Sequence, residues 1–200
     1  VTGRYFDIFG WMSADNTVTY DITPPVTSIT SVDEDATSPY WDRSNNDQTI
    51  IVVSGEAGMA CRLRTNDASY SGPGPVMDCS HSGSVATCSL LSTWGTFGVG
   101  LEGAGKIFYV SCKDAAGNKQ TAAQNLDVVF GLDWTEPAGS IVINGGAVAT
   151  EASYVALTLS CADSVSGCST MQFSNDGVAF SAEQAFETSY FPWPLLPGEG

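Results

Sequence analysis

The stretch GKIFYVSCKDAAGN, Gly105 to Asn118, is an alternating apolar run that ends in a cluster of turn-forming residues. Alternation with a period of two is typical of a strand with one buried face, and Asp, Gly and Asn favour tight turns. The stretch GRYFDIFGWMSADN, Gly3 to Asn16, aligns with it without gaps and places Phe6 on Phe108. In both places another apolar run follows. We therefore predict that each stretch is one strand, joined through its terminal turn to a second strand, as in the last hairpin of an antiparallel sandwich domain.

The composition extends this prediction to the whole chain of 200 residues. Apolar residues make up 43% and charged residues only 14%, so the residues that populate surface helices are scarce. Runs of Val, Ile, Thr, Tyr and Phe are broken repeatedly by Gly, Pro, Asn and Asp. The pattern predicts an all-β protein, and the length allows one large domain or two ordinary ones.

Two joints with the pattern D-x-T-x-P divide the chain: DITPPVTSI from Asp21 and DWTEPAGSI from Asp133. Proline stiffens such joints and cannot donate to a strand ladder, so each is predicted to be a linker before a first strand. The predicted units are residues 1–22, the last two strands of a domain; residues 25–132, a complete domain; and residues 138–200, the first five strands of a domain.

The middle unit is predicted to hold seven short strands, the density of an immunoglobulin-like sandwich, with a long polar insert at Asp33–Asp47. The strands are expected at 26–32, 49–54, 59–65, 76–79, 86–91, 107–113 and 121–129. In the last unit they are expected at 141–144, 154–161, 168–175 and 178–181, with a turn at 174–177. Residues 189–200 are expected to contain no final hairpin and to end in a loop at Leu195–Gly200.

The two ends of the chain, joined in the order C-terminus to N-terminus, match one continuous stretch of the middle unit. LLPGEG followed by VTGRYFDIFGWMSADN matches GVGLEGAGKIFYVSCKDAAGN of the middle unit, so residues 138–200 and 1–24 together amount to about one domain. A linker of about six residues spans at most about 20 Å, whereas a sandwich is about 30–40 Å long, so closure within one chain is disfavoured. We expect the hairpin of a neighbouring copy to complete the domain, a head-to-tail contact that builds an open filament. Two alternatives remain: the 200 residues are one repeat of a longer chain, or a fragment of a large adhesin. The residues expected at this interface are Tyr5, Phe6, Ile8, Trp11, Val18, Tyr20, Trp134, Trp193, Leu195 and Leu196.

Three features of the sequence resemble a known family: the DAAGN turn, the D-x-T-x-P joints and the run INGGAVATEASYVALTLSCADSVSGCSTMQFSNDGVAFSAEQAF. The sequence resembles the tandem bacterial immunoglobulin-like or fibronectin-type repeats of large extracellular surface proteins. The resemblance implies tandem antiparallel sandwiches, one complete and one split between the two chain ends. Such repeats serve as stalks, spacers, adhesins and enzyme appendages, so the resemblance says less about function than about fold. At Met12 to Asn16 the turn is kept but its leading Asp is lost.

Six cysteines in a β-rich, lysine-poor chain suggest disulfides and an oxidising, extracellular or cell-surface setting. A metal site is a poor alternative because no C-x-x-C motif occurs and His81 is the sole histidine. The pairing that we favour is Cys61–Cys112, Cys79–Cys88 and Cys161–Cys168. The first of these would join neighbouring strands and close a loop of about 50 residues, worth roughly 3–4 kcal/mol.

A net charge of −15, with no basic residue after Lys119, excludes a nucleic-acid partner because phosphates require a basic face. No apolar run approaches the roughly 18 residues of a membrane span. The acidic residues are interpreted as a solvated, mutually repelling surface, with Ca²⁺ binding as the alternative because hard cations favour carboxylate and carbonyl oxygens. The candidates for Ca²⁺ are Asp33, Glu34, Asp35, Asp114 and Asn118.

No motif for catalysis is present: no G-x-S-x-G elbow accompanies His81, and the glycine-rich stretches lack the Lys-Ser/Thr of a phosphate loop. We predict a structural protein that is not an enzyme and has no cofactor: a subunit or repeat of an extracellular filament, stalk or surface layer. The alternative is an adhesin or carbohydrate-binding module that uses Trp41, Trp94 or the insert Asp33–Asp47.

Overall fold

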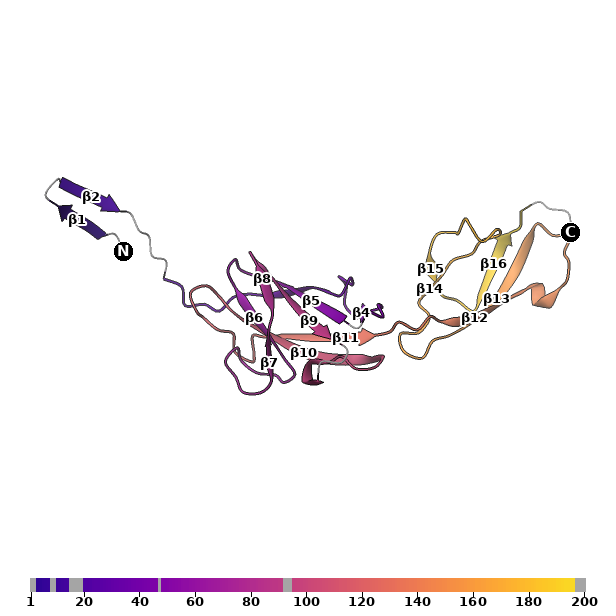
Figure 1. Cartoon of the computed structure of the whole chain (residues 1–200). Coiled ribbons are helices and arrows are strands. Elements are labelled where there is room, and N and C mark those ends of the chain that lie inside the picture. Colours follow the sequence, from indigo (N-terminus) through magenta and orange to yellow (C-terminus); the bar gives the residue numbers. More distant parts are fainter. Residues whose placement is uncertain (1–2, 8–9, 15–19, 47, 92–94, 197–200) are drawn as a thin grey trace.

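The computed structural model describes residues 3–7, 10–14, 20–46, 48–91 and 95–196. Within these ranges the protein is all-β, and its sixteen strands form three groups along the chain: a hairpin, a middle unit and a C-terminal unit (Figure 1). The remaining regular elements are two short 3₁₀ turns, Gly95–Phe97 and Asn144–Gly146. In the part of the chain that the structure describes, no helix combines the length and apolar composition needed to cross a membrane.

The N-terminal hairpin consists of β1 (Gly3–Asp7) and β2 (Gly10–Ala14), which pair antiparallel. The prediction of one continuous strand over Gly3–Asn16 is therefore wrong, because the chain reverses between Asp7 and Gly10. Residues 20–22, expected at the end of the second strand, are not in a strand, and residues 16–19 lie outside the described ranges. Apolar residues occur on both sides of the reversal, so the apolar pattern alone does not mark the turn.

The middle unit contains two sheets. The first has the order β3–β5–β9–β8, and the second has the order β4–β11–β10–β6–β7. All pairings are antiparallel except that of β4 with β11, which is parallel. The bounds are β3 Ser28–Val32, β4 Tyr40–Asp42, β5 Gln48–Ser54, β6 Ala60–Arg64, β7 Val76–Asp78, β8 Ser80–Ser82, β9 Val85–Leu91, β10 Gly103–Lys113 and β11 Leu126–Leu132.

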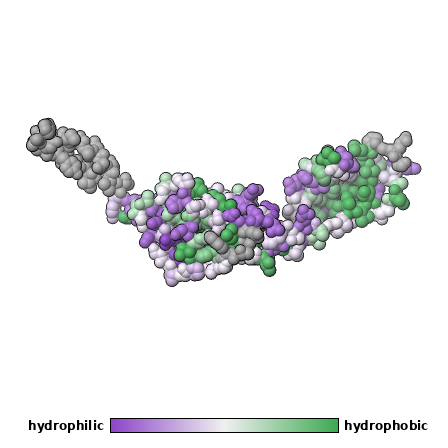
Figure 2. All heavy atoms as spheres, in the orientation of Figure 1, coloured by the Kyte–Doolittle hydropathy of each residue, from purple (hydrophilic) through white to green (hydrophobic). Residues whose placement is uncertain are grey.

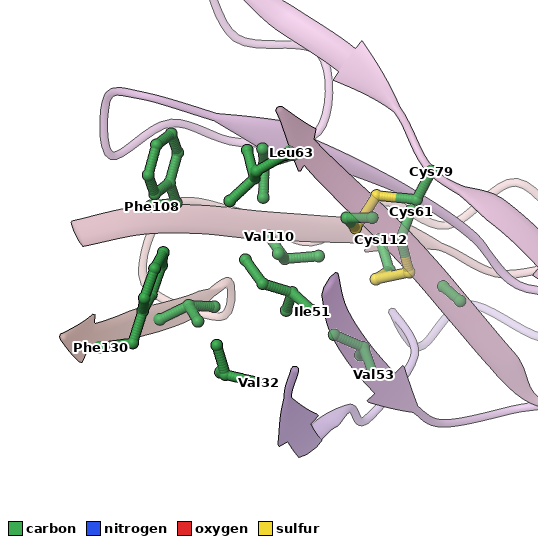
Figure 3. Close-up of a cluster of buried hydrophobic side chains, with 14 of the residues drawn as sticks. Val32, Ile51, Val53, Cys61, Leu63, Cys79, Phe108, Val110, Cys112 and Phe130 are labelled. Carbon is green, nitrogen blue, oxygen red and sulfur yellow. A yellow bond between two sulfur atoms is a disulfide. The ribbon is translucent and has the colours of Figure 1, made fainter. Parts of the chain in front are cut away.

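A single apolar core lies between these two sheets. Seventeen buried residues form it, and in the close-up Ile51 and Val53 of β5 lie near Val110 of β10 (Figure 3). In β5 buried and half-buried residues alternate, as a period of two requires when one face points into a core. Each fully buried apolar side chain contributes about 1.5–3 kcal/mol relative to exposure, so this unit has its own source of stability.

Three predictions for the middle unit need correction. The insert Asp33–Asp47 is not purely a loop, because it contains β4, and β8 was not expected. The last strand begins at Leu126 rather than Thr121. Its start is displaced because residues 121–125 form a turn, in which Asn125 N donates to Thr121 O and the Gln124 side chain accepts from Thr121 N.

The structure contains the three disulfides that the spacing favours: Cys61–Cys112, Cys79–Cys88 and Cys161–Cys168. Cys61 on β6 lies directly opposite Cys112 on β10, so this bond links neighbouring strands of one sheet. The bond between Cys79 and Cys88 connects the segment before β8 to β9, and the third bond closes the loop after β13.

The C-terminal unit has a three-stranded sheet of order β12–β13–β16 and a separate pair, β14–β15. The bounds are β12 Ala138–Ile143, β13 Tyr154–Ala162, β14 Thr170–Met171, β15 Gln184–Ala185 and β16 Ser189–Pro194. The strand β16, for which no bounds were expected, pairs with β13. The strand expected at 168–175 shortens to β14, and residues 178–181 form no strand. The reason is the wide turn at Ser174–Ala179, where the Asp176 carboxylate accepts from Val178 N and Ala179 N.

Candidate interaction site

The strands of the C-terminal unit correspond in order to those of the middle unit. The sheet β12–β13–β16 repeats the arrangement β3–β5–β9, and the pair β14–β15 repeats β6–β7. Among the described residues, no strand takes the place beside β14 that β10 takes beside β6. In the middle unit β10 and β11 supply six of the seventeen core residues. The C-terminal unit is therefore expected to expose the apolar face that two such strands would cover.

The inner face of β12 and β13 carries exposed apolar residues. In the strand register Ile141 lies opposite Leu159 and Ile143 lies opposite Leu157, and directly opposite residues share one face of a sheet. Leu157 is 2% exposed, whereas Ile141 and Ile143 remain 52% and 45% exposed. Among the residues of this unit that the structure describes, only Val155, Leu157 and Phe173 form its buried cluster. Figure 2 shows a broad hydrophobic area over it.

This face forms one side of an open apolar groove of about 350 Å³. The opposite side is the segment Thr170–Phe173, which includes β14. Apolar side chains from both sides and from Phe186 line the groove: Ile141, Leu159, Met171, Phe173 and Phe186. An unpaired strand edge beside an apolar groove offers a second strand both hydrogen-bonding groups and apolar contacts.

An aromatic cluster orders the inner face of this unit. The ring centre of Phe173 lies 5.0 Å from that of Tyr190 and 5.3 Å from that of Trp193. The Trp193 indole Nε1 donates to Asn175 Oδ1 at 2.9 Å, and Asn175 Nδ2 donates to Pro194 O at 2.9 Å. Tilted aromatic pairs and a satisfied indole hold the side chains in one arrangement. The groove is therefore largely formed in advance.

The residues predicted for the interface occupy different places. Trp193 lies in the aromatic cluster, Leu195 packs against that cluster, and Leu196 is exposed. Trp134 packs against the core of the middle unit, and Trp134 N donates to the Glu102 carboxylate. The others are Tyr5, Phe6 and Trp11 on β1 and β2, exposed Tyr20, and Ile8 and Val18, which lie outside the described residues.

The turn next to the groove gives a pH-dependent prediction. Hydrogen bonds from Ala179 N, Val178 N and the Ser174 hydroxyl lower the pKa of Asp176 to about 2, from an ordinary 3.8. A carboxylate whose pKa is lower in the folded than in the unfolded protein stabilises the fold at any pH above the unfolded pKa. This stabilisation disappears as the pH falls from about 4 to about 2. Carboxyl-carbon NMR is expected to give a titration midpoint near 2, and Ser174→Ala is expected to raise it. A midpoint at the ordinary value in the parent chain would contradict this assignment.

The acidic residues proposed for Ca²⁺ fall into two separate places. Asp33, Glu34 and Asp35 line a hollow beside the Asp33–Asp47 insert. Asp114 instead joins Asp21 and Glu56, with one carboxylate oxygen of each within 4.8 Å of the others.

Within this second group, burial raises the pKa of Asp114, but hydrogen bonds from Asn118 and Gly117 outweigh it and hold the pKa below its usual value. The Asn118 side chain also donates to Asp21 O. These three oxygens could hold a cation. Sequence reasoning had no signal for Glu56, because only folding brings it beside Asp114.

Comparisons with protein-family models, with curated proteins and with solved structures find no match to this chain.

Proposed function

We propose that the protein is a structural subunit of an extracellular filament, stalk or surface layer, in which the hairpin of one copy completes the C-terminal unit of the next. The observation that carries the proposal is the exposed inner face of β12 and β13, where Ile141 and Ile143 remain about half exposed beside buried Leu157. A well-formed groove with an apolar lining is the expected surface for a strand partner.

The hairpin β1–β2 supplies the two paired strands that would complete the C-terminal unit. Its register places Phe6 opposite Trp11 and Tyr5 opposite Met12. An isolated two-stranded hairpin is marginal in water, whereas docking against a sheet stabilises it. In the groove the hairpin would take the positions that β10 and β11 take in the middle unit.

Head-to-tail pairing leaves a free hairpin at one end of every complex and a free groove at the other, so copies add without closing into a ring. The order of the two sheets in the middle unit supports an immunoglobulin-like sandwich as the repeating body of such a filament. The three disulfides favour an extracellular location, because such bonds persist mainly in oxidising surroundings.

Sedimentation velocity combined with electron microscopy tests the proposal on the purified chain. We expect linear assemblies whose length increases with protein concentration. Intact mass of the assemblies after denaturation and reduction is expected to return the single purified chain of 20.9 kDa, which shows that non-covalent contacts hold the copies together. A single monomeric species at all concentrations would contradict the proposal.

A further inference from the structure

A second surface lies on the middle unit, apart from the groove. The turn after β3, the segment after β4 and Ile50 of β5 enclose an open hollow of about 650 Å³. This volume lies within the range of ligand sites, about 300–1,000 Å³. Its lining combines an indole, an amide, a hydroxyl and charged groups: Asp33, Glu34, Asp35, Trp41, Arg43, Ser44, Asn46 and Ile50.

The indole of Trp41 is held in a fixed position at this hollow. Trp41 lies opposite Gly131 in the pairing of β4 with β11, and a Cβ atom at position 131 would collide with the Trp41 ring. Glycine at 131 therefore lets the indole lie directly over the backbone of β11. The main chain that carries the indole is held as well, because the Asp35 carboxylate accepts from Trp41 N at 3.0 Å and from Thr37 N at 3.1 Å. A half-buried indole that is fixed in this way provides a rigid apolar platform.

Hydrogen-bonding groups of both kinds surround the platform. Asn46 Oδ1 accepts from Gln48 N at 3.0 Å, which leaves its amide N–H groups as donors, and Arg43 adds an exposed guanidinium. Asp33 Oδ2 lies 3.3 Å from Ser44 Oγ, whose hydroxyl also faces Asp42 Oδ1 at the shorter distance of 2.8 Å, and Glu34 is exposed, so the Asp33 and Glu34 carboxylates retain capacity as acceptors. Three carboxylates against one guanidinium make the hollow unfavourable for an anionic ligand.

We infer that this hollow binds a neutral oligosaccharide, with a sugar ring on the Trp41 indole and its hydroxyl groups bonded to Asp33, Glu34 and Asn46. Sugar rings present an apolar face edged by hydroxyl groups that donate and accept, which is the combination that the hollow offers. The inference does not depend on assembly through the groove. It would give the filament a carbohydrate-binding surface on every middle unit.

The test is titration of the full chain with maltotriose, cellotriose, triacetylchitotriose and the acidic comparator tri-galacturonate. Tryptophan fluorescence and saturation-transfer NMR detect binding. We expect saturable binding of at least one neutral trisaccharide and none of tri-galacturonate. Trp41→Ala is expected to weaken that binding on the order of tenfold or more, equivalent to about 1.4 kcal/mol.

Two further variants separate loss of the platform from loss of the fold. Gly131→Ala displaces the indole without removing it and is expected to weaken binding; circular dichroism confirms that the strands remain. Glu34→Gln is expected to weaken binding severalfold, whereas Glu183→Gln, an equally exposed acid in the C-terminal unit, leaves it unchanged. The inference is overturned if no neutral trisaccharide binds, if only tri-galacturonate binds, or if a folded Trp41→Ala chain binds as tightly as the parent.

Discussion

Replacing Ile141 with Asp is expected to abolish assembly at concentrations where the parent chain forms filaments. Ile141 is 52% exposed in the free subunit, so the carboxylate remains solvated there and the fold is retained. In the assembled state the same position would be covered by the incoming hairpin, where an unpaired charge costs several kcal/mol. A loss of about 3 kcal/mol in the free energy of association raises the concentration needed for assembly by roughly 100-fold. Sedimentation velocity over a concentration series measures this shift.

The matched control is Ile107→Asp. Ile107 lies on β10 and is 44% exposed, on the outer face of the complete middle unit. The same chemical change at similar exposure is therefore expected to leave assembly almost unchanged. Equal effects of the two substitutions would show that assembly depends on general surface hydrophobicity, and would contradict a role for the groove.

Removing the disulfide between β6 and β10 by Cys61→Ala with Cys112→Ala is expected to lower the free energy of unfolding of the middle unit by about 4 kcal/mol. The bond joins residues 51 apart in sequence, so it removes a large loop entropy from the unfolded chain. Urea denaturation in the Ile141→Asp background, which prevents assembly from obscuring unfolding, measures the loss.

The shorter bond provides the comparison. Cys79 and Cys88 are only 9 residues apart, so the double alanine variant is expected to lose about 3 kcal/mol, less than the longer bond. All four cysteines are nearly buried, so the cavities left by the two variants are similar. A larger loss for the short loop would argue against unfolded-state entropy as the main origin of the stabilisation.

Much of the fold was predictable from the sequence because its signals are local. A run of β-branched apolar residues marks β5, alternating apolar residues mark β9, and turn residues at 114–118 mark the end of β10. The joints at Asp21 and Asp133 fall between the groups of strands. The disulfide pairing was favoured because each pair lies either in a short loop or on strands expected to be neighbours.

The features that were not predicted depend on contacts distant in sequence. The strand β4 is only three residues long and forms because β11 offers an edge for parallel pairing. The reversal between β1 and β2 is not marked in the sequence, because apolar residues occur on both sides of it. Likewise, the packing of Trp41 against Gly131 depends on two segments, about 90 residues apart in sequence, that lie side by side in the fold. The sequence predicts an incomplete domain but not the groove itself. The apolar lining of the groove could not be predicted, because it comes from segments that are distant in sequence.

The central claim, completion of one copy by the hairpin of another, is tested most directly by mixing two defective chains. The first carries Ile141→Asp and keeps its hairpin; the second lacks residues 1–16 and keeps its groove. Neither is expected to assemble alone, because each lacks one side of the contact. Sedimentation velocity of the mixture is predicted to show a one-to-one dimer that cannot grow further. A mixture that sediments as two independent monomers would contradict the account.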